Sequence, residues 1–417
     1  MTERKKIIVV GAGAAGMMAA GQAALSGAET ILLEKMARPG MKLAITGKGR
    51  CNLTNIAPIP EFIGHFGRNG RFLRQAFHRF FNDDLILFFE SKGLLLTKER
   101  GGRVFPTKGK AQQVVKVFVD WLDKCGVKVK YNSAVTELLV TENGVAGVVC
   151  NGKRIAADAV ILSTGGACYP ATGSTGDGYP MAQQLGHSVV TVRPALVPLV
   201  TKGGARKMAD LNLRNIGVRL IIDGKKAAEG FGEVTFANYG VTGPVILTLS
   251  AVAVDALQTQ KKVELILDLK PALDDKKLDA RLLRDFAKRD KETIASILRG
   301  LLPREMVEVC LEEIEVPADR VGHSVTAVER KKLRHWLKNF RITVIDHRPL
   351  KEAIVTAGGV TLAEVNPRTM ESQKVKNLFF TGELLDLQAD TGGYNLQAAF
   401  STGWLAGNCA AIGTVVE

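Results

Sequence analysis

The N-terminal segment constrains the fold more than any other part of the chain. Residues 5–10 (KKIIVV) form a short apolar, β-branched run that predicts a buried strand. The glycine-rich run GAGAAG (11–16) follows at once and leads into a helix-like stretch, and ETILLEK (29–35) predicts a second strand. A strand, a helix and a second strand within about 30 residues make a βαβ unit of a parallel sheet. The predicted fold class is therefore α/β.

Each glycine of the first turn has a separate physical role in such a unit. Gly11 permits the tight turn, Gly13 lets a diphosphate approach the backbone, and Gly16 lets helix and strand pack closely. The helix N-terminus offers free N–H groups and a positive dipole end to phosphate. Glu34, at the end of the second strand, is placed to accept hydrogen bonds from ribose hydroxyls. The pattern predicts a dinucleotide-binding site of the Rossmann type.

Three later segments extend this site. AVILSTGG (159–166) and NLFFTGE (377–383) are apolar strands that end in small residues, so a flat ligand could pass close to their carboxyl ends. DTGGYNLQAAFSTG (390–403) opens a second helix, with the backbone N–H groups of Gly393 and Tyr394 at its start. A second positive helix end suits a cofactor that gains negative charge on reduction. The pyrimidine edge of a flavin does so, which favours FAD over a nicotinamide cofactor.

The sequence pattern of apolar strands followed by glycines is interrupted at about residue 190 and resumes at about residue 350. Short alternating strands are followed by a helix expected to begin after GPVILTLSAV (243–252), and the charged segment 274–340 has helical periodicity. We expect a small inserted domain, with the substrate cleft between it and the FAD-binding domain. The expected bounds are 1–190 with 350–417 for the discontinuous FAD-binding domain and 191–349 for the insertion, β-rich at 191–270 and 341–349 and helical at 271–340.

Composition limits the class of protein and its partners. No apolar run reaches the ~18 residues of a membrane span, and the N-terminal apolar run is too short for a signal peptide. The 6 cysteines show neither CxxC nor metal-ligand spacing, so we expect reduced thiols, no metal site and a cytoplasmic protein. The net charge is +14, and residues 1–130 carry 22 Lys and Arg against 10 Asp and Glu. Such a region could meet nucleic acid, an acidic ligand or neither.

The densest basic part, RNGRFLRQAFHRFF (68–81), has helical spacing. We interpret it as a solvated basic face over an apolar stripe, because it lacks the aromatic–basic alternation that stacks bases. The apolar face would comprise Phe72, Leu73, Ala76, Phe77, Phe80 and Phe81, and the other face Arg71, Arg74 and His78.

Motifs along the whole chain resemble those of one family. They are GAGAAG…LLEK, PGMKLAITGKGRCNLTN, GGRVFP, STGG…YPATGSTGDGYPMAQQLGH, GEVTFANYGVTGPVIL, VTAGGV and FFTGELLDLQADTGGYNLQAAFSTG, in this order. Together they resemble the bacterial NAD(P)/FAD-dependent oxidoreductases called BaiN-like or aminoacetone-oxidase-like flavoproteins. The resemblance implies a Rossmann-like FAD-binding domain of the glutathione-reductase/fumarate-reductase-like superfamily. The stretch 171–187 also resembles a loop of fumarate reductases and ketosteroid dehydrogenases, which hints at C=C bonds next to carbonyls as substrates.

The resemblance implies how FAD is bound. The 42–55 loop would wrap the cofactor, with Lys42 and Arg50 able to pair with phosphate. Val135 would touch the adenine through its backbone, and residues 392–395 would meet the pyrimidine edge. Cys51 is interpreted as a small packed residue. The implied site residues are Gly11, Gly13, Ala14, Ala15, Gly16, Glu34, Lys35, Gly40, Lys42, Thr46, Gly47, Arg50, Cys51, Asn52, Val135, Thr164, Gly165, Gly382, Glu383, Asp386, Gly392, Gly393, Tyr394 and Asn395.

The predicted activity is hydride transfer between flavin N5 and a small organic substrate. No second strand–GxGxxG–helix unit follows Gly16, so NAD(P)H would enter the substrate cleft only transiently. The alternatives are reduction of an activated C=C bond, oxidation of an amine-type donor with O₂, tRNA modification, and flavin-bound regulation without catalysis. Where relatives have Phe-Thr-His or Phe-Thr-Glu, Asn238 stands here and cannot act as an acid or base. Protic candidates are Tyr169, His187 and Tyr239, and no catalytic residue is assigned.

Overall fold

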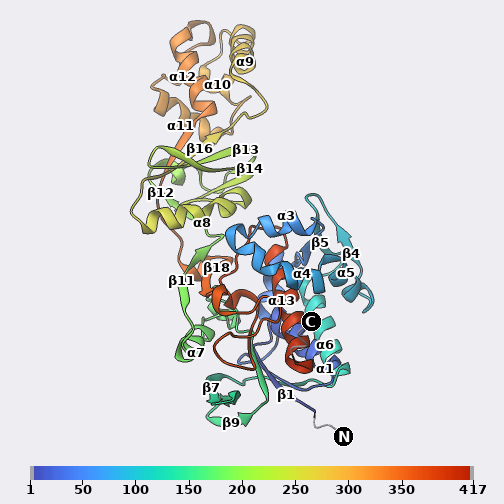
Figure 1. Cartoon of the computed structure of the whole chain (residues 1–417). Helices are drawn as coiled ribbons and strands as arrows, with labels where there is room; N and C mark the ends of the chain where they lie inside the picture. Colours follow the sequence, from blue (N-terminus) through green and yellow to red (C-terminus); the bar gives the residue numbers. More distant parts are fainter. Residues whose placement is uncertain (1–3, 414–417) are drawn as a thin grey trace. The chain divides into compact units, whose positions relative to one another are not determined.

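The computed structural model describes residues 4–413. The chain divides into two compact units (Figure 1). Each unit has its own hydrophobic core. Unit 1 comprises Met1–Pro194 and Ala353–Glu417, and unit 2 comprises Ala195–Glu352.

A five-stranded parallel sheet forms the centre of unit 1, with strand order β19-β10-β1-β2-β6. The strands β1, β2 and β10 are buried almost throughout, as expected of a parallel sheet covered on both faces. The predicted Rossmann-like α/β fold is confirmed. The strands are β1 (Lys6–Val10), β2 (Glu29–Leu33), β6 (Lys128–Lys130), β10 (Ala159–Leu162) and β19 (Leu378–Phe380).

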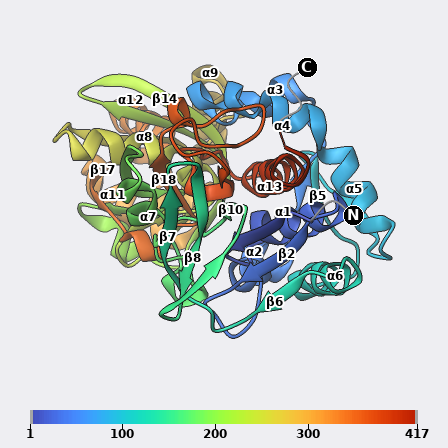
Figure 2. The same cartoon turned by 60° about the horizontal axis from the view of Figure 1, so that its bottom comes forward.

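Two helices of unit 1 pack unusually closely. They are α1 (Ala14–Leu25), which links β1 and β2, and the C-terminal α13 (Tyr394–Ile412) (Figure 2). A Cβ added at Gly403 or Gly407 would lie 2.3 Å from a carbonyl oxygen of α1, so only glycine allows this approach. The close packing brings the N-terminus of α13 to the same part of unit 1 as that of α1.

Three small sheets surround the central one. The antiparallel sheet β7-β8-β9 does not include β10, which pairs with β1 instead. The AVILSTGG strand therefore belongs to the central parallel sheet. The strands of the small sheets are β3 (Thr54–Asn55), β4 (Leu96–Lys98), β5 (Arg103–Pro106), β7 (Val135–Thr141), β8 (Gly144–Cys150), β9 (Lys153–Ala156), β11 (Val189–Ala195) and β18 (Val355–Val360).

The remaining helices of unit 1 differ from the expected ones at two places. The segment 68–81 divides into the 3₁₀ helix η1 (Gly67–Leu73) and the α-helix α4 (Arg74–Arg79). The 42–55 loop begins with a helical turn, α2 (Met41–Gly49), from which Thr46 departs with ψ 150°. The others are α3 (Ile59–Gly64), α5 (Asn82–Glu90), α6 (Ala111–Lys124) and α7 (Gly178–Gln184).

Unit 2 contains a closed six-stranded barrel, whose closure the sequence did not predict. Helix α8 (Pro244–Gln258) packs on it and begins well before the predicted start after Val252. Proline favours the first helical position because its fixed φ suits a helix and its missing N–H is not needed there. The barrel strands, in spatial order, are β12 (Leu199–Thr201), β15 (Gly240–Thr242), β14 (Lys225–Ala237), β13 (Asn212–Ile222), β16 (Val263–Asp268) and β17 (Phe340–His347).

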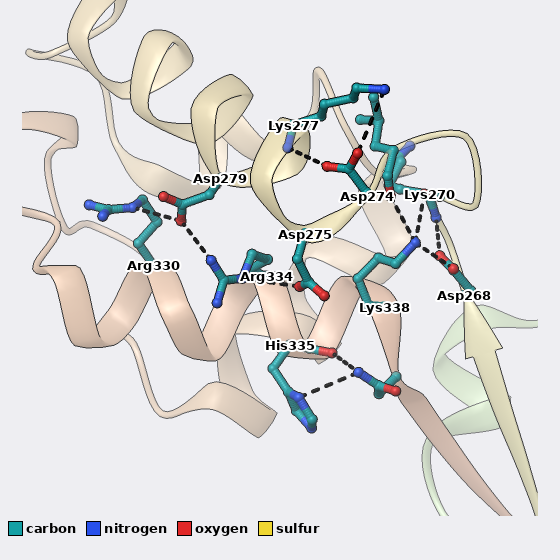
Figure 3. Close-up of polar contacts among 12 residues, drawn as sticks. Asp268, Lys270, Asp274, Asp275, Lys277, Asp279, Arg330, Arg334, His335 and Lys338 are labelled. Carbon is teal, nitrogen blue, oxygen red and sulfur yellow. Dashed lines mark hydrogen bonds and ion pairs between the residues drawn. The ribbon is translucent and has the colours of Figure 1, made fainter.

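Four helices lie between β16 and β17: α9 (Asp275–Lys288), α10 (Ile294–Leu298), α11 (Arg304–Ile314) and α12 (Ala327–Lys338). Ion pairs join α9 to α12 (Figure 3). Asp279 lies 3.1 Å from Arg330 and 3.4 Å from Arg334. Arg330 and Arg334 of α12 therefore have an acidic partner on α9.

Residues 4–413 contain no helix long and apolar enough to cross a membrane. The 6 cysteines, all within this range, are free thiols. The same residues hold no group of three or more His, Cys, Asp or Glu that could bind a metal ion.

Candidate cofactor site

The carboxyl ends of β1, β10 and β19 meet at one edge of the central sheet because the three strands are adjacent and parallel. The first glycine motif, residues 163–166 and residues 381–383 follow these strands. A hydrogen bond of 2.6 Å between the hydroxyls of Ser163 and Thr381 joins two of the turns. The structure thus brings together three of the segments that the sequence predicts at the site.

The glycines of the first turn differ in what surrounds them. Gly11 has φ 99°, and a Cβ on Gly16 would lie 1.8 Å from the carbonyl oxygen of Gly11. A Cβ on Gly13 would meet no atom of the protein within 4 Å. Gly13 is also the N-cap of α1, which has no side-chain cap. Open space therefore lies beside an uncapped helix N-terminus, where a diphosphate could approach the backbone.

Glu34 is fixed at the end of β2. Its buried carboxylate accepts hydrogen bonds from the backbone N–H of Ala12 (2.7 Å) and of Met36 (2.8 Å). Because a carboxylate has about four lone-pair sites, acceptor capacity for ribose hydroxyls remains. The neighbouring Lys35 turns to Asp177, at 2.5 Å.

The 42–55 loop is held in a strained conformation. Gly47, Lys48 and Cys51 have φ of 57°, 57° and 59°, in the left-handed region. Lysine and cysteine rarely adopt this region, and such residues cluster at functional sites. The loop starts beside the first glycine motif, since the N–H of Gly40 donates to the carbonyl of Ala12 at 2.8 Å.

The two cations expected at phosphate have carboxylate partners in this structure. The ammonium of Lys42 is 2.6 Å from Glu383. Arg50 pairs with Glu99, and its guanidinium lies 4.4 Å from the centre of the Phe105 ring. Lys42 therefore stays within the site, whereas Arg50 contacts the β4–β5 hairpin.

Cys51 is fully buried, and burial raises the pKa of its thiol to about 12. A thiol with this pKa is protonated at neutral pH and is a poor nucleophile. Its environment suits a packed residue rather than a redox thiol.

The loop meets residues 390–395 (DTGGYN), called the tail motif below, at the start of α13. The side-chain amide of Asn55 donates to the carbonyl of Gly392 at 3.2 Å, and a Cβ on Gly393 would lie 2.4 Å from the carbonyl oxygen of Thr54. Gly393 is the N-cap of α13 and, like Gly13, has no side-chain cap. Asn395 closes its own turn through two hydrogen bonds of 2.9 Å to Ala389.

A buried network around Glu383 was missed in the sequence. Its second carboxylate oxygen accepts the backbone N–H of Thr356 at 2.7 Å. The Thr356 hydroxyl accepts the N–H of Ala167 at 2.9 Å and donates to the Cys168 sulfur at 3.2 Å. In the sequence, VTAGGV (355–360) was identified only as a family motif. Its spacing in the chain does not predict that Thr356 would contact residues 167 and 168. The network fixes Glu383 between two strand ends.

Three buried polar atoms at the site have no hydrogen-bond partner among the described residues: Asn52 Oδ1, Thr164 Oγ1 and Gln388 Oε1. An unsatisfied buried polar atom costs about 1–3 kcal/mol, so such atoms usually have a ligand or water partner. Asn52 and Thr164 belong to the predicted site, and Gln388 lies beside it but was not predicted. Together with the space at Gly13 and the two uncapped helix ends, these acceptors and donors fit the hydroxyls and phosphates of FAD.

The other predicted residues lie in several places. Gly165 has φ 74° and follows β10, and Val135 is buried at the start of β7. Gly382 has φ 64°. Asp386 is buried and accepts a hydrogen bond of 3.0 Å from the side chain of Asn69. Tyr394 stacks on the imidazole of His65, with ring centres 3.8 Å apart.

The three candidate proton donors lie in different parts of the structure. His187 is buried against Phe380, and its Nε2 lies 2.9 Å from the Ser372 hydroxyl. Tyr239 belongs to unit 2, beneath the Arg348 guanidinium at 4.7 Å. Asn238 lies in the same β14–β15 connection. Tyr169 is half-buried in unit 1 with φ 58°, next to Cys168.

Known proteins were found that resemble the whole chain. A family model described as HI0933-like protein Rossmann domain matches residues 5–409. A 3-dehydro-bile acid delta(4,6)-reductase of Clostridium scindens is 32% identical over 408 residues, 97% of this chain and 99% of that protein. A ribosomal RNA dihydrouridine synthase of Haemophilus influenzae is 28% identical over 407 residues, 97% and 98% of the two chains.

The fold also resembles that of a flavocytochrome c3 fumarate reductase in its open conformation. The TM-score is 0.52 at 20% identity, covering 98% of this chain and 78% of that one. At this identity the likeness concerns the fold alone. The near-complete family match and the bile acid reductase relative confirm the family that the motifs predicted. The chain belongs to the HI0933-like family of FAD-dependent oxidoreductases.

Proposed function

We propose that this protein is a reductase that uses FAD and NAD(P)H to saturate a C=C bond conjugated with a carbonyl group. The observation that carries the proposal is the second uncapped helix N-terminus, at Gly393, on a helix that packs along α1 and runs in the same direction. The names of both relatives support this reaction class. A delta(4,6)-reductase and a dihydrouridine synthase each saturate a carbon–carbon double bond.

The chain's own residues would share the work of holding the cofactor. The free N–H groups of α1 would face the diphosphate, and Glu34 would accept the ribose hydroxyls. The N–H groups at the start of α13 would stabilise negative charge at the pyrimidine edge. When bound, FAD would supply hydride exchange at N5.

Saturation of a conjugated C=C bond also needs a proton for the carbon next to the carbonyl. Tyr169 is the candidate donor because it lies in unit 1 beside Cys168 and no described residue accepts its hydroxyl hydrogen. His187 is committed to Ser372, and Asn238 has no acidic proton at neutral pH. The left-handed backbone of Tyr169 is costly for an aromatic residue and is found mainly at functional sites.

A second candidate substrate is a pyrimidine base in RNA. A specific observation favours it: several arginines exposed on unit 1, at residues 68–74, have no acidic partner. The ribosomal RNA dihydrouridine synthase relative supports the same class. Oxidation of an amine with O₂ has no comparable support.

The test is a double-mixing experiment without oxygen. The protein is first reduced with NADPH or NADH, then mixed with a 3-keto-Δ4 steroid, a uridine oligonucleotide, aminoacetone or O₂-saturated buffer. We expect rapid reoxidation by the enone or the uridine and a product heavier by two hydrogens. Tyr169→Phe should slow that second step and leave the reduction by NADPH unchanged. Reoxidation by O₂ alone would overturn the proposal in favour of an oxidase.

A further inference from the structure

One segment of unit 1 contains no acidic residues of its own. From Phe62 to Asn82 the chain contains no Asp or Glu, and three arginines stand at intervals of three residues. We propose that Arg68, Arg71 and Arg74, called the basic rim below, bind the phosphate backbone of an RNA substrate. This inference rests on the proposed function, since it assumes that RNA is a substrate of the same site.

The arginines of the rim are exposed and unpaired. All three side chains are exposed, and none forms an ion pair with another described residue. In helix α12 of unit 2, by contrast, Arg330, Arg334 and Lys338 each lie within reach of an aspartate (Figure 3). Like charges that repel each other and lack counterions in the protein are a typical electrostatic footprint of a polyanion site.

The secondary structure aligns the rim. Arg68 and Arg71 belong to η1, a 3₁₀ helix, in which residues i and i+3 lie directly above one another about 6 Å apart along the axis. Arg74 follows as the first residue of α4. Arg68 and Arg71 therefore start on the same side of this segment, with Arg74 next to them, and each guanidinium can bind one phosphate with two hydrogen bonds. Three such groups suit successive phosphates of one strand better than a single carboxylate.

The rim is fixed relative to the candidate cofactor site. Asn69, between the first two arginines, donates hydrogen bonds to the backbone carbonyl of Asp386 (2.8 Å) and to its carboxylate (3.0 Å). A Cβ on Gly70 would lie 2.0 Å from the carbonyl oxygen of Ile63, so η1 packs tightly on α3. Leu73 and Phe77 are buried beneath the rim. A strand on the rim would therefore run beside the tail motif that precedes α13.

The probe is a fluorescein-labelled single-stranded RNA of about 20 nucleotides containing uridines, with binding followed by anisotropy across a salt series. The test variant is Arg68→Ser, Arg71→Ser, Arg74→Ser in the full-length chain. The matched control is Lys276→Ser, Arg284→Ser, Lys288→Ser, which removes the same charge from exposed, unpaired positions of α9. Single substitutions at each rim arginine provide data if the triple variant does not fold.

Loss of three phosphate contacts should reduce the slope of log K against log salt by about 2 and weaken binding on the order of 100-fold at ~0.1 M salt. The control should keep the slope and affinity of the wild-type protein. An equal loss of RNA affinity in both variants would show that only the net charge of the protein matters, and would overturn the proposal. Absence of RNA binding by the wild-type protein, or rim-dependent binding only to anionic lipid vesicles or to a carboxylated enone, would overturn it as well.

The same samples separate this inference from the proposed function. Reduction by NADPH and reoxidation by a 3-keto-Δ4 steroid are measured in the wild-type protein and the rim variant. If the wild-type protein performs neither step but binds RNA through the basic rim, the reductase proposal is wrong and the RNA-binding proposal stands. If both proteins perform both steps and bind RNA equally well, the rim proposal fails alone.

Discussion

Lys42 and Glu383 stand 341 residues apart in the chain, yet Nζ of Lys42 lies 2.6 Å from Oε2 of Glu383. The pair joins the loop after the first glycine motif to the turn after β19. The other oxygen of Glu383 accepts the N–H of Thr356, so one carboxylate connects three segments of the candidate site. Both side chains are mostly shielded, with 24% and 21% exposed.

We expect Lys42→Met and Glu383→Gln each to lower the free energy of unfolding of the FAD-free protein by about 1–2 kcal/mol, because each leaves a partly buried group without its partner. The double variant should lose less than the sum of the two. Urea unfolding of the four proteins measures the coupling. Strictly additive losses would show that the pair contributes nothing to stability.

The two glycines of the first turn should respond oppositely to the same change. Gly13 has φ −80° and open space around it, so Gly13→Ala should leave the stability of the FAD-free protein within about 0.5 kcal/mol of wild type. It should lower FAD affinity about tenfold or more, because the methyl group occupies the space assigned to the diphosphate. Gly16→Ala should destabilise the FAD-free protein by more than ~2 kcal/mol through its clash with Gly11. FAD titration and urea unfolding measure these effects, and wild-type FAD affinity in Gly13→Ala would contradict the placement of the diphosphate.

Thiol labelling tests the interpretation of Cys51. Burial raises the pKa of Cys51 to about 12 and that of Cys168 to about 11, so neither should form thiolate at pH 8. We expect iodoacetamide to leave both unmodified in the folded protein and to label them after unfolding. Mass spectrometry of the peptides gives the result. Labelling of Cys51 in the folded protein at the rate of the unfolded chain would contradict its interpretation as a packed residue and would support a redox role.

His187 should make stability depend on pH near neutrality. Burial lowers its pKa, although the nearby Glu364 opposes the shift. As pH falls below about 6.5, the His187 imidazole becomes protonated in the unfolded chain but stays neutral in the folded protein. The free energy of unfolding should therefore decrease, by at most about 1.4 kcal/mol per pH unit, until the folded pKa is reached.

His187→Gln should flatten this profile between pH ~5 and ~7, whereas the exposed His78→Gln should not. Hydrogen bonds from Lys374 and Ser188 outweigh burial and lower the pKa of Glu364 to about 2, so its own contribution is lost only at pH values below its ordinary range. Urea unfolding across the pH range separates the two groups. An unchanged slope in His187→Gln would assign the pH dependence elsewhere.

The first βαβ unit was predictable because its signals are local. An apolar run, three glycines and a terminal acid lie within about 30 residues and determine strand, turn and helix together. The open space at Gly13 could be foreseen for the same reason, since spacing alone distinguishes this glycine from Gly11 and Gly16.

Barrel closure was not predictable, because it depends on pairing between distant strands such as β12 and β17. Short alternating strands give the same pattern in open and closed sheets. The start of α8 was missed because its first residues, Val245 to Leu249, are as apolar as a buried strand.

At the site, sequence motifs indicated which segments take part but not which atoms meet. Thr356 and Gln388 carry no spacing signal, and their importance follows from a hydrogen bond to Glu383 in one case and an unpartnered oxygen in the other. Arg50, which is expected at phosphate, pairs in this structure with Glu99, a residue of the hairpin that no motif linked to it.

The visible spectrum of the purified protein during an anaerobic titration with NADPH tests the central claim most directly. We expect flavin bands near ~370 and ~450 nm that persist through gel filtration and bleach as NADPH is added. A protein without these bands, even after incubation with FAD, would contradict the assignment of the site.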